Sequence, residues 1–174
     1  NMIDSLLRAV TDLQSNGHVL VLASDIPLIT KEAIQDFLRS CSQRKADVYY
    51  SFVPKVTVEQ KYPKVKRTYV HLKDGVVTGG NIILIEPQTI IKHKERIRQA
   101  IALRKHPLKL CQLLGFRFLF KLLLGQLGVG EIESRVEQIL KLKGAGIVSL
   151  YPEIGVDVDK VSDLELVRSI LQKK

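Results

Sequence analysis

Two short acidic segments follow strand-like runs in this sequence, and their carboxylates are candidate ligands for a metal ion. Asp25 comes directly after the apolar or small residues 19–24, and Pro27 ends that run because proline cannot donate to a strand ladder. Asp157 and Asp159 lie in a second acidic segment near the C-terminus. Strand ends in an α/β pattern can converge at one edge of a sheet, and Mg²⁺ binds through one or two carboxylates together with phosphate oxygens. We therefore predict that Asp25 and Asp159 form a Mg²⁺ site.

Other roles are open for each of these carboxylates. Asp25 also fits a helix cap or a solvated loop charge, since Thr30 predicts the capped start of a helix shortly after it. Asp159 also fits the N-terminal cap of a last helix. Asp157 competes as the second ligand, because alternation along an extended segment places Asp157 and Asp159 on one side. Glu153 is a weaker third candidate.

Three motifs carry a resemblance to a known family. They are Ser24-Asp25-Ile26-Pro27-Leu28, then Gly79-Gly80-Asn81, then Gly155-Val156-Asp157-Val158-Asp159-Lys160 with Asp163-Leu164. In this order and at these separations they resemble the nucleotidyltransferase family related to molybdenum-cofactor guanylyltransferases, and the likeness covers most of the chain. The resemblance implies a glycosyltransferase-A-like fold: a three-layer α/β domain with a mixed, mostly parallel sheet flanked by helices. It also implies Mg²⁺-dependent transfer of a nucleoside monophosphate from a triphosphate to a phosphorylated or anionic acceptor, with release of pyrophosphate.

The same resemblance assigns roles to particular residues. Asp25 and Asp159 are the expected catalytic residues, and Asp157 joins them as a candidate metal ligand. The glycine pair fits either a β-bulge or a close approach of the backbone to substrate, because glycine inside a strand weakens it otherwise. The cations fit either phosphate neutralisation or plain solvated surface. The expected substrate-binding residues are Gly79, Gly80, Asn81, Arg67 and Lys160.

One part of the family pattern is not found in these 174 residues. The family opens with a strand and a glycine-rich loop that holds the nucleotide phosphates, whereas this chain begins in a predicted helix over residues 1–15. We expect the chain to be the C-terminal two-thirds of the family domain and to be inactive as this fragment. The apolar stripe of the first helix is then expected to be exposed or covered by self-association; it comprises Ile3, Leu6, Leu7, Val10 and Leu13.

The apolar periodicity predicts the elements that position the acidic segments. Strand-like runs alternate with amphipathic helices, which predicts one mixed sheet flanked by helices in a single domain, 1–174, with a helical insertion at about 87–142. The expected strands are 19–24, 46–53, 66–72, 76–85 and 146–150. The expected helices are 1–15, 31–43, 87–104, 108–124, 131–142 and 163–171.

The charge of the chain is high and uneven. The formal net charge is +9, and 44–73 holds eight basic against two acidic residues. Such a field attracts anions, but no zinc-finger spacing or aromatic-basic RNA motif points to nucleic acid. Cys41 and Cys111 stand in no metal or redox spacing, which predicts core thiols in a reducing cytoplasm. No secretory signal and no run of about 18 apolar residues appears.

Two other functional classes fit the same sequence. One is a non-catalytic binding or assembly module of the same fold, with the basic helices as its interface and a homo-oligomer as one outcome. The other is a basic membrane-surface protein built around 108–124, where Leu and Phe share the helix with Lys109, Arg117 and Lys121. The sequence does not specify the nucleotide base or the acceptor.

Overall fold

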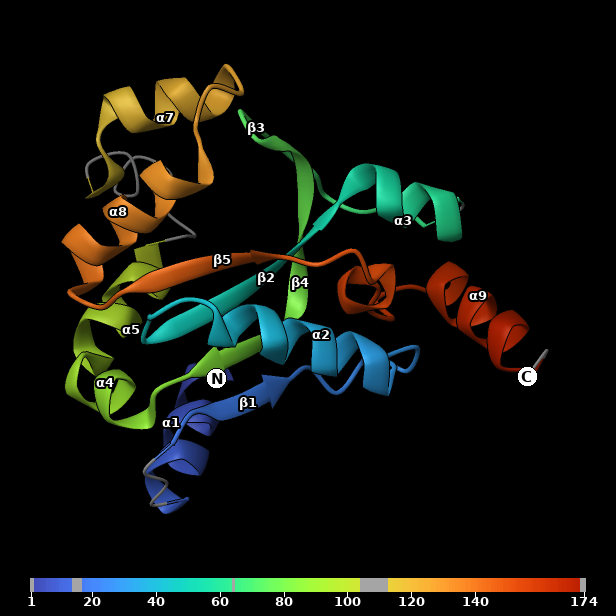
Figure 1. Ribbon diagram of the computed structural model, residues 1–174, viewed down its shortest axis with the longest axis horizontal. Coiled ribbons are helices and arrows are strands. Elements are labelled where there is room, and N and C mark those ends of the chain that lie inside the picture. Colours follow the sequence, from blue (N-terminus) through green and yellow to red (C-terminus); the bar gives the residue numbers. More distant parts are fainter. Residues whose placement is uncertain (1, 14–16, 64, 104–112, 173–174) are drawn as a thin grey trace.

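The computed structural model describes residues 2–13, 17–63, 65–103 and 113–172, and these form a sheet flanked by helices (Figure 1). The strands are β1 Val19–Leu22, β2 Val48–Pro54, β3 Val70–Leu72, β4 Gly75–Ile85 and β5 Gly144–Val148. The helices of the first half are α1 Met2–Asp12, α2 Lys31–Ser42, α3 Lys55–Lys61, α4 Pro87–Lys92 and α5 Lys94–Leu103. Those of the second half are α7 Phe116–Leu123, α8 Val129–Leu140, the 3₁₀ turn η1 Pro152–Gly155 and α9 Val161–Leu171.

The sheet is mixed, as predicted, but it is not mostly parallel. Its order is β1-β4-β2-β5, with β3 paired to β4 beyond the end of this path. Strand β4 is antiparallel to β1, β2 and β3, and within the described part of the chain only β2 and β5 form a parallel pair. The expectation of a mostly parallel sheet is therefore wrong, because one long reversed strand contributes three of the four ladders.

Strand direction nevertheless brings the predicted site segments together. Strands β1 and β2 both oppose β4, so they run the same way, and β5 runs with β2. The carboxyl ends of β1, β2 and β5 therefore meet at one edge of the sheet. Asp25 follows the first of these ends, and the segment with Asp157 and Asp159 follows the last.

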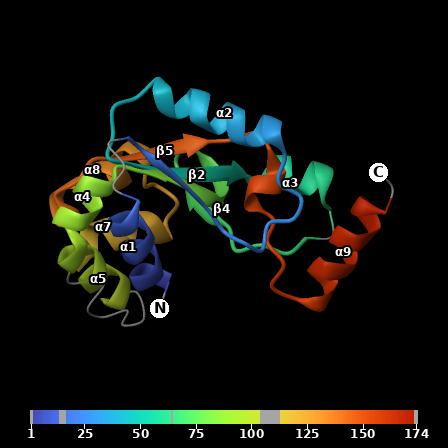
Figure 2. The same ribbon diagram turned by 90° about the horizontal axis from the view of Figure 1, so that it is seen from below.

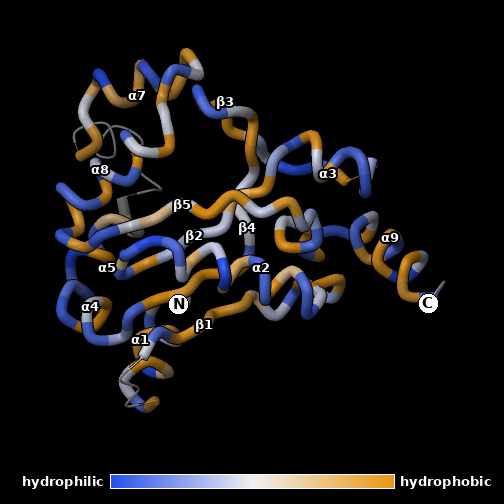
Figure 3. The backbone as a smooth tube through the Cα atoms, in the orientation of Figure 1, coloured by the Kyte–Doolittle hydropathy of each residue, from blue (hydrophilic) through white to orange (hydrophobic). Residues whose placement is uncertain are grey.

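Helices cover both faces of the sheet and complete three layers (Figure 2). On one face, α2 buries Phe37 against Tyr49, Ile82 and Ile147 of the strands. On the other face, α1 and α4 pack against the opposite sides of the same strands. The second core comprises Leu7, Val10, Ile85, Ile90 and Leu142. Apolar side chains leave β1 on both faces, which explains its continuous hydrophobic colour in Figure 3.

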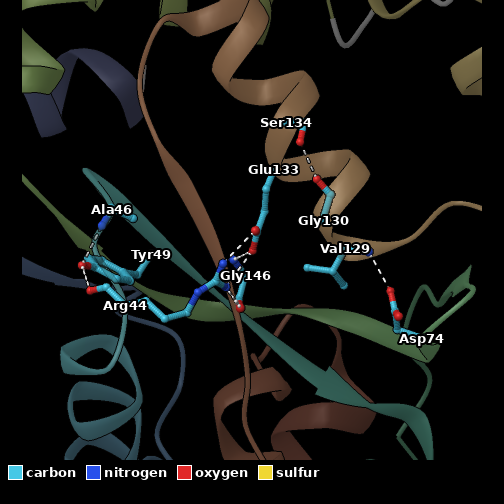
Figure 4. A network of polar contacts seen from close by, with 9 residues as sticks. All are labelled: Arg44, Ala46, Tyr49, Asp74, Val129, Gly130, Glu133, Ser134 and Gly146. Carbon is cyan, nitrogen blue, oxygen red and sulfur yellow. Dashed lines mark hydrogen bonds and ion pairs between the residues drawn. The ribbon is translucent and has the colours of Figure 1, made fainter.

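The edge strand β5 is closed by side chains rather than by another strand (Figure 4). The Arg44 guanidinium donates to both carboxylate oxygens of Glu133 at 2.8 Å, and it donates to the Gly146 carbonyl at 3.1 Å. Glu133 in turn accepts from Gly146 N at 2.7 Å. The backbone donor and acceptor of Gly146 that face outward are thus satisfied, and α8 is fixed to the sheet.

Several helices differ from the sequence expectation. The helix predicted over 87–104 divides at His93 into α4 and α5. The helix predicted over 108–124 is interrupted at Gly115: residues 113–114 are helical and α7 starts at Phe116, because Gly115 adopts φ +89°, which a helix cannot continue through. On α7 the side chains of Phe116, Phe120 and Leu123 are exposed.

Two further expectations concern single features. Cys41 is a core thiol, as predicted: it lies on the buried face of α2, and burial raises the pKa of its thiol to about 11. Cys111 lies outside the described residues. Among the helices that the structure describes, none is both long enough and apolar enough to cross a membrane.

Candidate active site

The corner after β1 holds Asp25 in a fixed and exposed position. The Thr30 hydroxyl accepts from Ala33 N at 3.2 Å and caps α2, as the sequence predicted. Ile26 and Leu28 are buried on either side of Pro27, so alternate residues of the corner anchor it in the core. The Asp25 carboxylate is left in solvent at the carboxyl end of β1.

The second acidic segment is tied to the first by its backbone. After η1 and the buried Val156, Val158 N donates to the carbonyl oxygen of Asp25 at 2.9 Å. The Asp163 carboxylate accepts from the backbone N–H groups of Asp159 and Lys160 at 3.2 Å each, which caps the start of α9. The cap of the last helix is therefore Asp163, and the Asp159 side chain is exposed next to it.

These contacts bring three carboxylates together. Asp25, Asp157 and Asp159 each offer an oxygen, and the three oxygens all lie within 4.8 Å of one another. Oxygens that bind one Mg²⁺ at 2.0–2.1 Å are at most about 4.2 Å apart, so a hard divalent cation needs only small side-chain adjustments to fit. Carboxylate oxygens are also the donor type that such cations prefer. The geometry fits the predicted ligand set, while cation binding itself stays a prediction.

Arg67 and Asp157 form a close ion pair at this cluster. One terminal nitrogen of the Arg67 guanidinium pairs with Asp157 Oδ1, and the other donates to the Asp157 carbonyl oxygen. The Arg67 side chain is 9% exposed and that of Asp157 is 21% exposed. Burial raises the pKa of the Asp157 carboxyl more than the Arg67 charge lowers it, and Asp159 and Asp25 add to the rise. Arg67 was expected to bind substrate phosphate, but both of its terminal nitrogens contact Asp157.

The Gly79-Gly80-Asn81 motif forms an irregularity in β4 beside the acidic segments. Tyr50 pairs with Ile83 but Phe52 pairs with Gly79, so β4 carries extra residues between the two pairs. A Cβ on Gly80 would meet Ser51 Oγ at 2.1 Å and Ile154 Cγ2 at 2.7 Å, so packing alone requires glycine there. Gly80 is buried and Gly79 is exposed.

Asn81 links this irregularity to the acidic loop. Its side-chain amide donates to the Ile154 carbonyl oxygen at 3.1 Å, and its backbone carbonyl oxygen accepts from Ala23 N at 3.0 Å. Lys160, the other expected substrate cation, is exposed at the first position before α9. Asn81 thus contacts residues that flank both acidic segments, Lys160 directly follows Asp159, and Gly79 lies two residues before Asn81 on β4; none of the three belongs to the cluster.

Glu153 is a residue whose role the sequence reasoning missed. Its side chain is 2% exposed, and it accepts from Thr30 Oγ1 at 3.0 Å and from Lys61 Nζ at 2.9 Å. It lies outside the carboxylate cluster and joins the starts of α2 and η1 to the end of α3. A signal was present, because an acidic residue between Pro152 and Ile154 in an apolar stretch is buried only when it is paired.

Comparison with known proteins identifies one informative relative. No protein-family model matches the chain, and no curated protein matches it. Among solved structures, it is similar to a hypothetical transferase from Thermus thermophilus, with 40% sequence identity and a TM-score of 0.88. The match covers 94% of this chain and 69% of the Thermus chain. The fold is therefore that of a transferase-like α/β domain.

Proposed function

The chain belongs to the same family as the Thermus thermophilus hypothetical transferase, and on that premise we propose that it is a Mg²⁺-dependent nucleotidyltransferase domain. The reaction transfers a nucleoside monophosphate from a nucleoside triphosphate to a phosphorylated or anionic acceptor. The observation that carries this proposal is the convergence of Asp25, Asp157 and Asp159 at one edge of the sheet. The three sequence motifs that resemble molybdenum-cofactor guanylyltransferases support the nucleotidyl class in particular.

The proposed chemistry requires charge control more than covalent participation by the protein. An acceptor oxygen attacks the α-phosphorus, the bond from that phosphorus to the bridging oxygen breaks, and pyrophosphate leaves. A bound Mg²⁺ would neutralise charge on the phosphate oxygens. Asp25 and Asp159 would hold the cation from two loops that the hydrogen bond from Val158 N to the Asp25 carbonyl oxygen fixes to each other. No side-chain nucleophile is needed, because positioning and electrostatics supply the acceleration.

The residues bordering the cluster have proposed roles toward the acceptor. Gly79 is exposed at the irregularity of β4, where the Tyr50 hydroxyl takes the place of a side chain and the Gly79 backbone is the part proposed to meet the acceptor. The side-chain nitrogen of Asn81 donates to Ile154, which leaves its side-chain oxygen Oδ1 as an acceptor for a substrate hydroxyl. Lys160 supplies a flexible point charge to an anionic group from the start of α9.

Titration with Mn²⁺ followed by electron paramagnetic resonance tests the proposed site, with Mn²⁺ replacing Mg²⁺. We expect one binding site, and we expect both Asp25→Asn and Asp159→Asn to weaken it by at least tenfold with nearly unchanged melting temperature, since both side chains are exposed. In an assay of pyrophosphate release by the full-length enzyme, Asp25→Asn should abolish Mg²⁺-dependent turnover.

Asp12→Asn is the matched control, because Asp12 is an exposed aspartate on α1, away from the carboxyl edge of the sheet. Its Mn²⁺ affinity should equal that of the wild type. If Asp25→Asn and Asp159→Asn retain wild-type Mn²⁺ affinity, the acidic cluster is not the cation site and the proposed function loses its support.

A further inference from the structure

The Arg67–Asp157 pair gives the acidic cluster an internal counter-ion. Three carboxylates within 4.8 Å of one another repel strongly, and the Arg67 guanidinium offsets one of these charges. Its two terminal nitrogens contact both the side chain and the backbone of Asp157, so the position of the residue is fixed as well as its charge.

Burial makes this contact difficult for water to replace. Only 9% of the Arg67 side chain is exposed, and its Nε is buried without a hydrogen-bond partner among the described residues. By contrast, the Asp25 and Asp159 side chains are exposed. The three carboxylates are therefore not equivalent: one is held by a cation of the protein, and two face the solvent from which a metal ion arrives.

We propose that Arg67 is a positioning residue that withdraws Asp157 from direct cation binding and lowers the affinity of the cluster for a free divalent cation. This inference rests on the proposed function. Three carboxylates and one guanidinium give the cluster a formal charge of minus two. The cluster therefore attracts a free cation less strongly than three uncompensated carboxylates would. It also repels the anionic phosphate groups of a cation–phosphate complex less strongly. Arg67 thus favours the cation–phosphate complex over the free cation.

A series of charge variants tests this proposal with Mn²⁺ as the probe. Arg67→Gln leaves the cluster with a charge of minus three, Asp157→Asn with minus one, and the double variant with the wild-type value. We expect Arg67→Gln to bind Mn²⁺ about tenfold more tightly than the wild type and Asp157→Asn about tenfold more weakly, since one charge at this range shifts an ionic equilibrium by at least that factor. The double variant should match the wild type within a few fold.

The same series measured with Mn²⁺–pyrophosphate should give the opposite result for Arg67. Arg67→Gln should bind this anionic complex at least tenfold more weakly than the wild type, while Arg67→Lys should recover most of the loss. If Arg67 only supported the fold, its replacement would weaken the binding of both free Mn²⁺ and Mn²⁺–pyrophosphate. The opposite signs of the two effects therefore separate a charge-setting role from a structural one.

The design remains decisive if one variant does not fold. Removing one partner of a buried ion pair is costly, so the two single variants, Arg67→Gln and Asp157→Asn, are the ones at risk. The double variant removes both charges, and its Mn²⁺ affinity should exceed that of Asp157→Asn. Equal or weaker binding by the double variant would show that the Arg67 charge does not lower the affinity for the free cation, and it would overturn this inference alone. Absence of Mn²⁺ binding by the wild type would overturn the proposed function as well.

Discussion

Gly80 is the residue at which the site region is packed most tightly. It lies between Ser51 of β2 and Ile154 of η1, and it belongs to the irregular part of β4. The sequence left a β-bulge and a close approach to substrate as alternatives for this glycine. The structure shows an irregular ladder at this position, and the close approach is made by the protein's own side chains.

Replacement of Gly80 by alanine should therefore destabilise the fold. The added Cβ would stand 2.1 Å from Ser51 Oγ, which forces the strands apart, and we expect a loss of about 1–3 kcal/mol in the free energy of unfolding. Urea denaturation measures the change. Gly130→Ala is the control, because nothing lies within 4 Å of its Cβ position in α8 and the change should be neutral or stabilising. Equal midpoints for the two variants would contradict this account.

At the residue scale, the sequence predicted the acidic residues but not their partners. Asp25, Asp157 and Asp159 were found because they follow strand-like runs. The partners of Asp157 and Glu153 were not, because Arg67 is 90 residues from the first and Lys61 is 92 residues from the second. Contacts at that separation leave no trace in local periodicity.

Among the elements, α8 is attached to the edge of the sheet through the carboxylate of Glu133. The hydrogen bond from Arg44 lowers the pKa of Glu133 despite its partial burial, and Gly146 N–H adds to the effect. Asp74 Oδ2 fixes the start of the same helix by accepting from Val129 N at 2.7 Å (Figure 4). The attachment therefore depends on Glu133 being ionised.

Glu133→Gln should destabilise the protein more near neutral pH than in acid. Because the folded-state pKa lies below its ordinary value of 4.5, the ion pair contributes stability above that pH and loses it as the pH falls through the folded pKa. We expect the variant to lose about 1 kcal/mol at pH 7, a value reduced by the partial exposure of Arg44, and to show a smaller deficit at pH 3.

Urea unfolding at the two pH values measures this difference. Glu137→Gln, one turn further along α8 and exposed, is the control and should change stability at neither pH. A deficit of Glu133→Gln that persisted unchanged at pH 3 would assign the effect to packing rather than to charge.

Element positions followed from the sequence more closely than strand directions did. The run at 19–24 corresponds to β1, and the gap between the expected strands 66–72 and 76–85 corresponds to the β3–β4 connection. The direction of β4 between β1 and β2 did not follow, since alternation of apolar residues is the same in parallel and antiparallel ladders. The break at His93 also carried no glycine or proline to predict it.

Across the whole molecule, the sheet has one edge covered and one edge open. Ala23 N donates to Asn81 O, which places the hydrogen-bonded pairs of the β1–β4 ladder at alternate residues, including Val19 and Val21. The amides of Leu20 and Leu22 consequently point away from β4. Among the described residues, no strand pairs with that outer side.

Amide hydrogen exchange should therefore alternate along β1. The amides of Val19 and Val21 should exchange slowly, because they donate into the sheet, and those of Leu20 and Leu22 should exchange much faster. Nuclear magnetic resonance at single-residue resolution measures these rates, with Ile83 on the central strand β4 as the slow reference. Equal protection of all four amides would show that a further strand covers this edge in solution.

The hydrogen bonds that Arg44 and Glu133 make with the Gly146 backbone also limit association of copies by strand pairing. A fibre built by strand addition needs two free edges on every molecule, one to accept a neighbour and one to extend beyond it. Here the β5 edge has its backbone groups already bonded at Gly146. Two copies that paired through β1 would each have a β5 edge blocked at Gly146, so such pairing would end at a two-fold symmetric dimer and would not extend into a fibre.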